Sequence, residues 1–533
     1  MVEIFSRVIK IDSSKINPVK IRLKVCNYID FMHKPYWVFY LFIILLSTNF
    51  FACKNDFENY SDSPQDILSF SVDTLSFDTV LATVNSPVRF FRVYNKNTKP
   101  LLISSVRLAE GANSNFKINV DGIAGSIFEN VEILANDSIL VLVDVKPKEN
   151  GELTPILFND YVIFEIHNIQ QKIVLEAFGQ DVFVWRGITL SADSVLDNKK
   201  PYLIYDSLVI GKGTRVEIGE GSVFYMYNNA QLIVNGTVKI KGTIENPVLF
   251  RGSRTDYMLS IPYDLIPGQW GGIRFASESY NNELENVRIR NGRYGMNLEV
   301  CDDPSQSKLY IKNVVLTNVS GTLFQAVNCN ITAENCEFSN SKDALLHLVG
   351  GSSRFTHCTI VNYYPYYPEL GWVNSKNETL ILSDTVPSLE GNKDVYFPVI
   401  SAEFFNSIIW GGEYLSTSVI NIQKNTDTSI PYLFKNCLLP NKEIVDAGFV
   451  DCIFQSNSFK PDSLFQKIDP NDRKKNLFHP VFDFRLHKDS PAKDVANLEI
   501  ATQIPYDMNG FYRLSDGYPD LGAYEYNELR IEH

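Results

Sequence analysis

Seven short segments in the second half of this chain follow one pattern, and this repeat constrains the fold more than any other feature. Each begins with Asn, His or Asp and continues with an apolar residue (Ser407 in one segment), a residue of variable type and a second apolar residue. The intervals between successive segments are 27, 22, 22, 49, 30 and 15 residues. Periods of roughly 20–50 residues indicate a solenoid, in which each coil buries its apolar face only against neighbouring coils. The segments begin at Asn286, Asn313, Asn335, His357, Asn406, Asn436 and Asp451.

The repeat also predicts which side chains point into the solenoid. Side chains alternate along a strand, so the residue after the first position and the residue two further on share a face. The Asn residues should then stack at the turns and satisfy backbone groups, a structural role and not a catalytic one. The interval of 49 predicts a long insertion, and the interval of 15 a shortened last coil. The predicted inward pairs are Val287/Ile289, Cys336/Phe338, Cys358/Ile360, Cys437/Leu439 and Cys452/Phe454.

Cysteines occupy several of these inward positions. Two of the eight, Cys26 and Cys53, precede the repeats, and no CxxC or zinc-ligand spacing occurs. Buried cysteines can act as small hydrophobic residues. The alternative is at least one disulfide, with Cys301 and Cys329 as the pair that we favour. The six cysteines concerned are Cys301, Cys329, Cys336, Cys358, Cys437 and Cys452.

Phrases upstream of the repeats, such as Leu232-Ile233-Val234-Asn235-Gly236 and Gln269-Trp270-Gly271-Gly272-Ile273, resemble the opening coils of right-handed parallel β-helix proteins of the pectin-lyase-like superfamily. This resemblance implies a right-handed parallel β-helix over residues 181–480, with the sandwich described next or the segment 181–203 covering its first coil. The phrase Pro519-Asp520-Leu521-Gly522-Ala523-Tyr524-Glu525 resembles the end of many extracellular β-helix proteins. We therefore expect residues 481–533 to cap the last coil, with their Asp and Arg in turn and capping roles.

Residues 66–180 contain several short alternating strands separated by turn residues, which indicates an antiparallel sandwich. Val93-Tyr94-Asn95-Lys96-Asn97 and Leu175-Glu176-Ala177-Phe178-Gly179 resemble Ig-like domains of the ASPM/SPD-2/Hydin type. The predicted fold is therefore all-β: an N-terminal Ig-like β-sandwich followed by a right-handed parallel β-helix. The sandwich shows no catalytic constellation, and we interpret it as a spacer or docking module.

The segment Trp37–Cys53 is apolar, short for a membrane span, and ends in Ala52-Cys53. It resembles the lipobox of bacterial lipoproteins, which implies that Cys53 is lipidated and that 1–52, an upstream extension plus a signal peptide starting at Met32, is absent from the mature chain. Residues 53–65 would be a tether, and Lys54–Glu58 resembles the tag of Bacteroidetes-type surface lipoproteins. We expect an outer-membrane, cell-surface location. A membrane anchor or an ordinary cleaved signal is the alternative.

Charge excludes one class of partner. The chain has 49 Lys and Arg against 62 Asp and Glu. Residues 1–52 hold seven of the basic and three of the acidic residues, so 42 minus 59 leaves about −17 after their removal. Nucleic-acid binding requires a basic footprint, so we expect no nucleic-acid partner.

A catalytic site would have to use residues of adjacent coils. Polysaccharide lyases of the β-helix fold need a strong base and charge neutralisation, for which Ca²⁺ is one possible cofactor. No complete lyase or hydrolase signature is present. We therefore treat catalysis as the alternative function, and we expect no cofactor unless the protein is a lyase that uses Ca²⁺. The candidate catalytic residues are Arg288, Arg290, Asp302, Asp303, Asp343 and His347.

An aromatic cluster in the 49-residue interval is the candidate binding site. Aromatic faces stack on sugar rings, and insertions commonly carry function. The alternative is that these rings pack the insertion against the coils. The expected function is glycan binding or adhesion at the cell surface. The main alternative is a polysaccharide lyase or glycoside hydrolase, and a third possibility is a purely structural protein. The aromatic residues are Tyr363, Tyr364, Tyr366, Tyr367 and Trp372.

Overall fold

The structure is a computed structural model that describes residues 59–258, 261–364, 378–387, 394–411, 419–424, 429–440, 446–454, 463–468 and 482–528. The predicted export segment with Cys53, and Tyr366, Tyr367 and Trp372 of the aromatic cluster, lie outside these ranges. Within them, no helix is long and apolar enough to cross a membrane.

Two five-stranded sheets form the N-terminal sandwich, as the alternating pattern predicted. All strand pairs are antiparallel except β2 and β10, which run parallel. Alternate residues of β8, including Val141, Val143 and Val145, are fully buried between the sheets. One sheet has the order β1 (Ser69–Phe70), β3 (Arg89–Asn95), β8 (Asp137–Val145), β5 (Phe116–Val120), β6 (Ile123–Gly125); the other has β2 (Thr74–Leu81), β10 (Ile169–Gln180), β9 (Ile156–Ile166), β4 (Leu101–Leu108), β7 (Ile127–Ile133), and the short 3-10 helix η2 is Gly111–Asn113.

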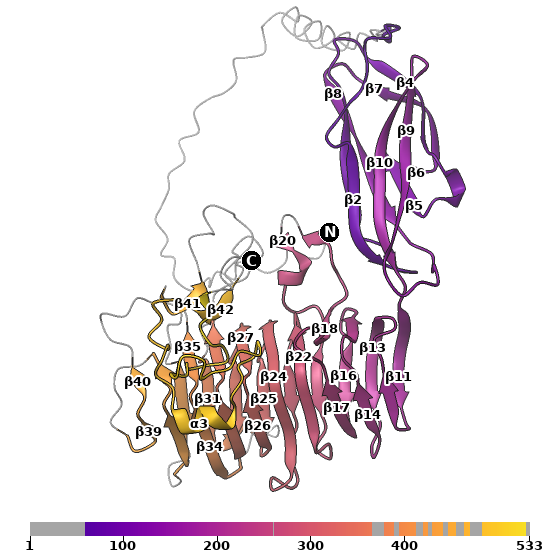
Figure 1. Cartoon of the computed structure of the whole chain (residues 1–533). Helices are drawn as coiled ribbons and strands as arrows, with labels where there is room; N and C mark the ends of the chain where they lie inside the picture. Colours follow the sequence, from indigo (N-terminus) through magenta and orange to yellow (C-terminus); the bar gives the residue numbers. More distant parts are fainter. Residues whose placement is uncertain are drawn as a thin grey trace, which may run out of the picture. The chain divides into compact units, whose positions relative to one another are not determined.

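The coil strands between Phe183 and Phe454 form a parallel β-helix, which confirms the predicted fold class. They belong to one 26-stranded sheet, in which strands pair in parallel with later strands on the next coil. Figure 1 shows these strands stacked from β11 to β40. The first half comprises β11 (Phe183–Leu190), β12 (Ser194–Leu196), β13 (Tyr202–Ile210), β14 (Arg215–Ile218), β15 (Val223–Met226), β16 (Gln231–Val234), β17 (Thr237–Lys241), β18 (Val248–Gly252), β21 (Gly272–Phe275), β22 (Asn282–Arg290), β23 (Met296–Leu298) and β24 (Ser307–Val319).

The second half of the solenoid contains the predicted insertion, which carries the small hairpin β32 (Thr385–Val386) and β33 (Val395–Tyr396). Its coil strands are β25 (Phe324–Val327), β26 (Asn330–Glu334), β27 (Glu337–Ser341), β28 (Leu346–Val349), β29 (Gly351–Thr356), β30 (Thr359–Asn362), β31 (Leu380–Ser383), β34 (Val399–Phe405), β35 (Ile408–Gly411), β36 (Ile420–Gln423), β37 (Tyr432–Lys435), β38 (Leu438–Leu439), β39 (Phe449–Val450) and β40 (Ile453–Phe454).

A ladder of left-handed residues sits at one corner of the coils. All seven residues that begin the repeat have φ between 46° and 53°. This region is disfavoured for most side chains but accessible to Asn and Asp, so the sequence places suitable residues where the chain turns. The amide of Asn313 donates to Oδ1 of Asn286 at 3.1 Å, and the side chain of Asn406 contacts Nε2 of His357 at 3.0 Å. The predicted ladder is confirmed.

The solenoid core is built from like residues stacked on successive coils. Rings of Phe355, Phe404, Phe434 and Phe449 stack with centroid distances of 5.1, 4.7 and 4.9 Å. Five of the six cysteines in the coils are buried, Cys452 is half-buried, and all six are free thiols. The inward positions that the repeat predicted therefore form the core, including the cysteine positions.

Of the two segments predicted to cover the first coil, 181–203 does not, because its strands β11 and β12 are part of that coil and pair with β13 and β14. The tail, with hairpin β41 (Phe465–Lys467) and β42 (Asp483–Leu486) and helix α3 (Leu498–Gln503), packs along the flank of the later coils, in an apolar cluster that includes Leu438 and Ile453.

Contacts along this flank explain why it is covered. The backbone N–H of Ala523 donates to Oγ1 of Thr359 at 3.0 Å, and that of Gly522 donates to the carbonyl of Asn406 at 2.8 Å. The outward side chains of Val361 and Trp410 share an apolar cluster with the tail. Outward strand positions on these coils are apolar, so burying them against the tail is favourable.

Candidate functional site

An insertion between β18 and β21 builds a surface pocket on the solenoid. It contains the two-residue strands β19 (Tyr257–Met258) and β20 (Ile261–Pro262) and the 3-10 helix η3 (Tyr263–Leu265). The amide nitrogen of Gln269 donates to the carbonyls of Tyr263 and Ile266, the latter at 2.7 Å. Gln269 also occupies the space where a Cβ at Gly252 would lie, 1.9 Å from its Oε1. Gly252 therefore lets the insertion fold onto the end of β18.

A pocket of about 280 Å³ lies between this insertion and the turn after β15. Its walls include Tyr227, Asn228, Arg254, Tyr263 and Gln269. Tyr227 is 43% exposed, so one aromatic face is available to solvent. The volume is near the lower end of small-molecule sites, about 300–1,000 Å³.

Arg254 supplies the planar polar group of this pocket. Its guanidinium lies over the ring of Tyr263, 3.6 Å from the centroid. Its Nε donates to Oδ1 of Asp256 at 2.9 Å, and this pairing raises the pKa of Arg254. The guanidinium of Arg254 thus contacts an aromatic ring on one side and is hydrogen-bonded to a carboxylate at its edge, which holds it in one orientation.

An ion cluster joins η3 of the insertion to the outward face of β18 and β22. Asp264 lies 3.1 Å from Nη2 of Arg251 and 2.9 Å from Nη2 of Arg290. Burial is the main cause that lowers the pKa of Arg290 and raises that of the nearby Tyr225. Because Asp264 is paired with two arginines of the coils, it fixes η3 to the solenoid.

Two of the predicted catalytic residues lie on this strand face but make structural contacts. Arg290 belongs to the Asp264 cluster. Arg288, two residues earlier on β22, donates from Nη1 to the carbonyl of Asn313 at 3.2 Å. In the parallel register these two arginines lie beside Val315 and Thr317 of the next coil.

The predicted carboxylates of the following loop lie elsewhere. Asp302 is exposed to solvent. Asp303 accepts hydrogen bonds from the backbone and hydroxyl of Ser305, at 3.0 and 2.6 Å, and from Gln306 at 2.8 Å. These bonds lower the pKa of Asp303, beginning with the Ser305 hydroxyl. Asp303 therefore stabilises its own turn.

His347 and Asp343 belong to a third part of the coils. His347 is on β28, beside Gln325 and Ile381 in register, and burial lowers its pKa. Asp343 is in the turn that precedes β28. The six predicted catalytic residues are thus spread over different ladders and loops. Across the described ranges, no group of three or more His, Cys, Asp and Glu could hold a metal ion.

The described part of the aromatic cluster differs from the exposed platform that we expected. The ring of Tyr363 lies 6.1 Å from that of Phe482 and 5.9 Å from that of Phe484, within the core beneath the tail. Tyr364 is 6% exposed. The ring of Tyr363 therefore packs against the tail, and that of Tyr364 is buried.

Beneath the tail lies a buried carboxylate with the chemistry of a proton donor. Glu337 accepts hydrogen bonds from the hydroxyls of Tyr524 and Ser339, and burial raises its pKa. However, Glu337 is only 9% exposed, and Tyr524 of the tail covers it. A substrate could not reach it in this structure, so its role is structural.

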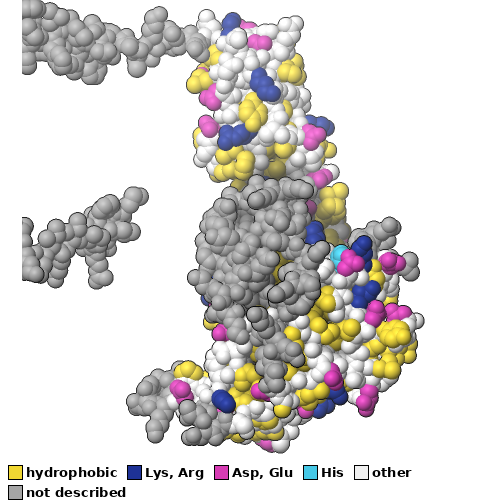
Figure 2. Space-filling model, turned by 90° about the vertical axis from the view of Figure 1, so that its left-hand side faces the viewer, with side chains coloured by type: hydrophobic (Ala, Val, Ile, Leu, Met, Phe, Trp, Pro, Cys, Tyr) yellow, Lys and Arg dark blue, Asp and Glu magenta, His cyan; other side chains and the backbone are white. Residues whose placement is uncertain are grey.

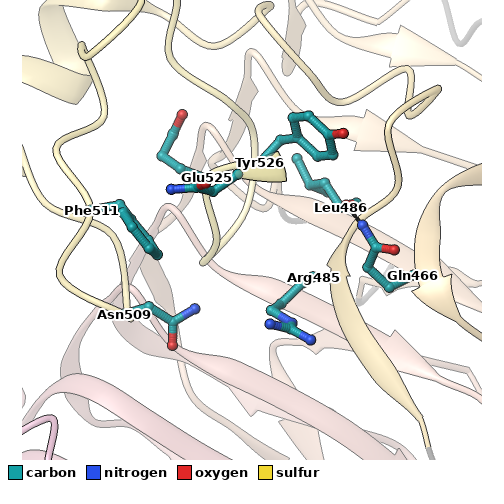
Figure 3. Close-up of a pocket in the computed structure, with 8 residues that line it drawn as sticks. Gln466, Arg485, Leu486, Asn509, Phe511, Glu525 and Tyr526 are labelled. Atoms are coloured by element: carbon teal, nitrogen blue, oxygen red, sulfur yellow. Dashed lines mark hydrogen bonds between the residues drawn. The ribbon is translucent and has the colours of Figure 1, made fainter. Parts of the chain in front are cut away.

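The tail itself encloses one small cavity, shown in Figure 3. Its volume is about 20 Å³, which is enough for about one water molecule. It is therefore too small for a sugar. The labelled lining residues are Gln466, Arg485, Leu486, Asn509, Phe511, Glu525 and Tyr526.

Sequence analysis missed the pocket of Tyr227, Arg254 and Tyr263. The available signal was the long interval between the strand phrase ending at Phe250 and the next at Ile273, with two tyrosines and an Arg–Asp pair inside it. The repeat was aligned only from Asn286 onward, so this insertion was not recognised.

No protein-family model matches the sequence, and no curated protein matches it. Among solved structures, the chain is similar to a family 123 glycoside hydrolase from Clostridium perfringens, described for glycolipid glycan hydrolysis, at 12% identity and a TM-score of 0.15. That match covers 21% of this chain and only 26% of the hydrolase chain. A second similarity, to the catalytic domain of a GH87 alpha-1,3-glucanase in complex with nigerose, has 11% identity and a TM-score of 0.15, and covers 71% of this chain and 90% of that one. TM-scores of this size carry no inference about activity.

Proposed function

We propose that this protein is an exported, lipid-anchored surface protein that binds glycan without catalysis, and that the pocket of Tyr227, Arg254 and Tyr263 holds the sugar. The single observation that carries the proposal is a pocket of about 280 Å³ lined by the contacting pair of Arg254 and Tyr263 and by Tyr227, which is 43% exposed. Aromatic rings offer apolar faces to sugar C–H groups, while guanidinium and amide groups supply hydrogen bonds to hydroxyls.

The state of the nearby carboxylates supports binding over hydrolysis. Glycoside hydrolysis usually needs two carboxyl groups on opposite sides of the scissile bond. Asp256 is bonded to Arg254, and Asp264 lies between Arg251 and Arg290. Both carboxylates close to the pocket are therefore engaged by arginines, which favours a positioning role for each.

The location rests on the leader and on the fold. The apolar run that ends at Ala52-Cys53 supports cleavage before Cys53 and lipidation of its thiol. A parallel β-helix behind a β-sandwich is consistent with the pectin-lyase-like and Ig-like families that the sequence resembles. The outer membrane and the cell surface are the location that we propose.

Charge supports the absence of a nucleic-acid partner. The chain has a net charge of −13. On the face shown in Figure 2, Lys and Arg side chains are interspersed with Asp and Glu among the described residues. Nucleic-acid binding commonly uses a continuous basic surface.

A glycan array probed with the full chain, followed by titration of the best ligands, tests the proposal. We expect saturable binding and no product from the same glycans, measured by reducing ends and by the ultraviolet absorbance of unsaturated uronates. Binding to no glycan would refute the proposed function. Turnover of any bound glycan would replace it with the lyase or hydrolase alternative.

A further inference from the structure

The six cysteines of the coils form three pairs that follow the register of adjacent coils. Residues of β23 pair with residues 28 positions later on β25, for example Met296 with Phe324 and Leu298 with Ala326. Cys301 and Cys329 keep the same offset beyond the ends of these strands. The other two pairs, Cys336/Cys358 and Cys437/Cys452, likewise continue the offsets of β27/β30 and β38/β40.

The sulfurs interact within all three pairs, but the Cys301–Cys329 pair combines a close sulfur contact with a buried lysine beside it. The two Sγ atoms lie 2.7 Å apart, and both residues are at most 2% exposed. Backbone bonds hold the two turns together: the N–H of Cys301 donates to the carbonyl of Val327 at 3.2 Å, and the amide of Asn328 donates to the carbonyl of Cys301 at 2.9 Å. The thiols are therefore fixed opposite each other by the coil itself.

A buried lysine beside this pair favours a negatively charged sulfur. Lys308 is 0% exposed, its ammonium donates to the carbonyls of Ala276 and Ser277, and it lies 5.1 Å from the ring centroid of Tyr280. In the described part of the chain it makes no ion pair with a carboxylate. The hydrogen bond with Cys329, and after it the charge of Lys308, lowers the pKa of the Cys301 thiol. A thiolate is the reactive form in disulfide exchange.

We propose that Cys301 and Cys329 are a modification site: they form a disulfide across adjacent coils by exchange with a disulfide-bearing oxidant. Cys301 is the attacking sulfur, because it lies between the exposed residues Val300 and Asp302 and is reached when this surface loop opens locally. The disulfide would tie the loop that carries Asp302 and Asp303 to the next coil. This inference depends neither on glycan binding nor on export, because the pairing follows from the coil register.

The exchange balances in two steps. The Cys301 thiolate attacks one sulfur of the oxidant, which forms a mixed disulfide and releases one thiolate. Cys329 then loses its proton and attacks the Cys301 sulfur, which breaks the mixed disulfide and releases the second thiolate. Two thiols are oxidised, one disulfide of the oxidant is reduced to two thiols, and the protons pass to the released thiolates.

Mass spectrometry of the full chain, equilibrated with glutathione disulfide, tests the proposal. After unfolding and alkylation, digestion after Lys, Arg and Glu separates Cys329 from Cys336, because Glu334 lies between them. We expect one linked peptide joining Cys301 and Cys329, lost on reduction, and two fewer alkylated thiols than in the reduced chain. Cys336, Cys358, Cys437 and Cys452 should remain alkylated.

Three variants complete the experiment. Cys301→Ser and Cys329→Ser should each abolish the linked peptide and restore one alkylated thiol at the remaining partner. Lys308→Met should slow formation of the disulfide by about threefold for each unit by which the Cys301 pKa rises, because the thiolate fraction falls about tenfold while the nucleophilicity of the thiolate rises about threefold. Full alkylation of Cys301 and Cys329 in the oxidised wild-type chain, or a link between other cysteines, would overturn the proposal whether or not the variants fold.

Discussion

Nη2 of Arg513 in the tail donates a hydrogen bond to Oδ1 of Asn335 in the solenoid at 2.9 Å, although the two residues are 178 positions apart. Arg513 is 0% exposed, and its Nη1 donates to Glu525 at 2.7 Å. Asn335 is one of the left-handed turn residues of the repeat, and its amide donates to the carbonyl of Tyr506. The tail is thus bonded to the turn ladder through two buried polar side chains, Arg513 and Asn335.

Arg513→Met should destabilise the docked tail. The change removes hydrogen bonds to Asn335, Glu525 and backbone carbonyls, and it leaves their acceptors buried and unpaired. Each acceptor that is left buried without a partner costs about 1–3 kcal/mol. Denaturant unfolding and proteolysis of the tail would measure the loss. Arg485→Met is the control, because its partly exposed pair with Asp483 should contribute under about 1 kcal/mol; equal losses in both variants would contradict the special role of Arg513.

Docking of the tail should weaken as pH rises from about 4 to about 8. Burial raises the pKa of Asp520 from 3.8 to about 6 and that of Glu525 from 4.5 to about 8, and it also raises those of Asp507 and Glu337. A carboxyl whose pKa is higher in the folded state contributes stability that is present below the unfolded pKa and is lost as pH rises through the folded pKa. Arg513 faces Glu525 and opposes this shift without reversing it.

Urea unfolding of the tail at several pH values would measure this slope. At about 1.4 kcal/mol per pKa unit, we expect a loss of a few kcal/mol between pH 4 and pH 8. Glu525→Gln keeps an acceptor for Arg513 but cannot ionise, so its curve should be flatter. A wild-type stability that rises over this interval would show that the carboxylates are stabilised by their partners and not penalised by burial.

Substitutions in the turn ladder should separate backbone conformation from hydrogen bonding. Asn406 is fully buried, has a φ of 46°, and exchanges hydrogen bonds with the backbone N–H and carbonyl of Asn497. Asn406→Gly retains access to this conformation but loses those bonds, which costs about 2–4 kcal/mol for the groups left unpaired. Asn406→Ala should cost about 1 kcal/mol more, because a Cβ disfavours positive φ.

Asn436 provides the matched comparison for this ladder. It has a φ of 51°, but its buried Oδ1 has no hydrogen-bond partner. Asn436→Gly should therefore change the free energy of unfolding by less than about 1 kcal/mol. Equal costs for the two glycine variants, measured by chemical denaturation, would mean that conformation alone maintains the ladder.

Lipidation of Cys53 remains a prediction from the sequence. Cells fed a labelled fatty acid should incorporate label into the wild-type chain and place it in the membrane fraction. Cys53→Ser should lose the label, since its thiol is the proposed attachment point. Unlabelled wild-type chain in the membrane fraction would favour an N-terminal apolar anchor.

The sequence was sufficient for the coils because their signal is local and repeated. Each turn required a residue that tolerates positive φ, and the two apolar positions after it had to face inward, so Asn335 with Cys336 and Phe338 revealed both the turn and the face. Stacking of like residues then followed from strand geometry.

The functional surface could not be read in the same way, because it depends on contacts between distant segments. Tyr363 belongs to the aromatic cluster that we expected to bind sugar, but its ring packs against Phe482 and Phe484 of the tail. Arg290 was a candidate base, but it forms an ion pair with Asp264, which belongs to an insertion that precedes the aligned repeats. No residue spacing or sequence motif predicts either contact.

Titration of the full chain with the best ligand from the glycan array, comparing wild type with Tyr227→Ala, Tyr263→Ala and Tyr518→Ala, tests the central claim most directly. Tyr518 is 65% exposed in the tail and does not line the pocket, so it is the matched control. We predict that each pocket variant weakens binding by about tenfold or more, since losing about 1.4 kcal/mol has that effect, and that Tyr518→Ala binds like wild type. Unchanged affinity in both pocket variants, with their folds intact by circular dichroism, would contradict the account.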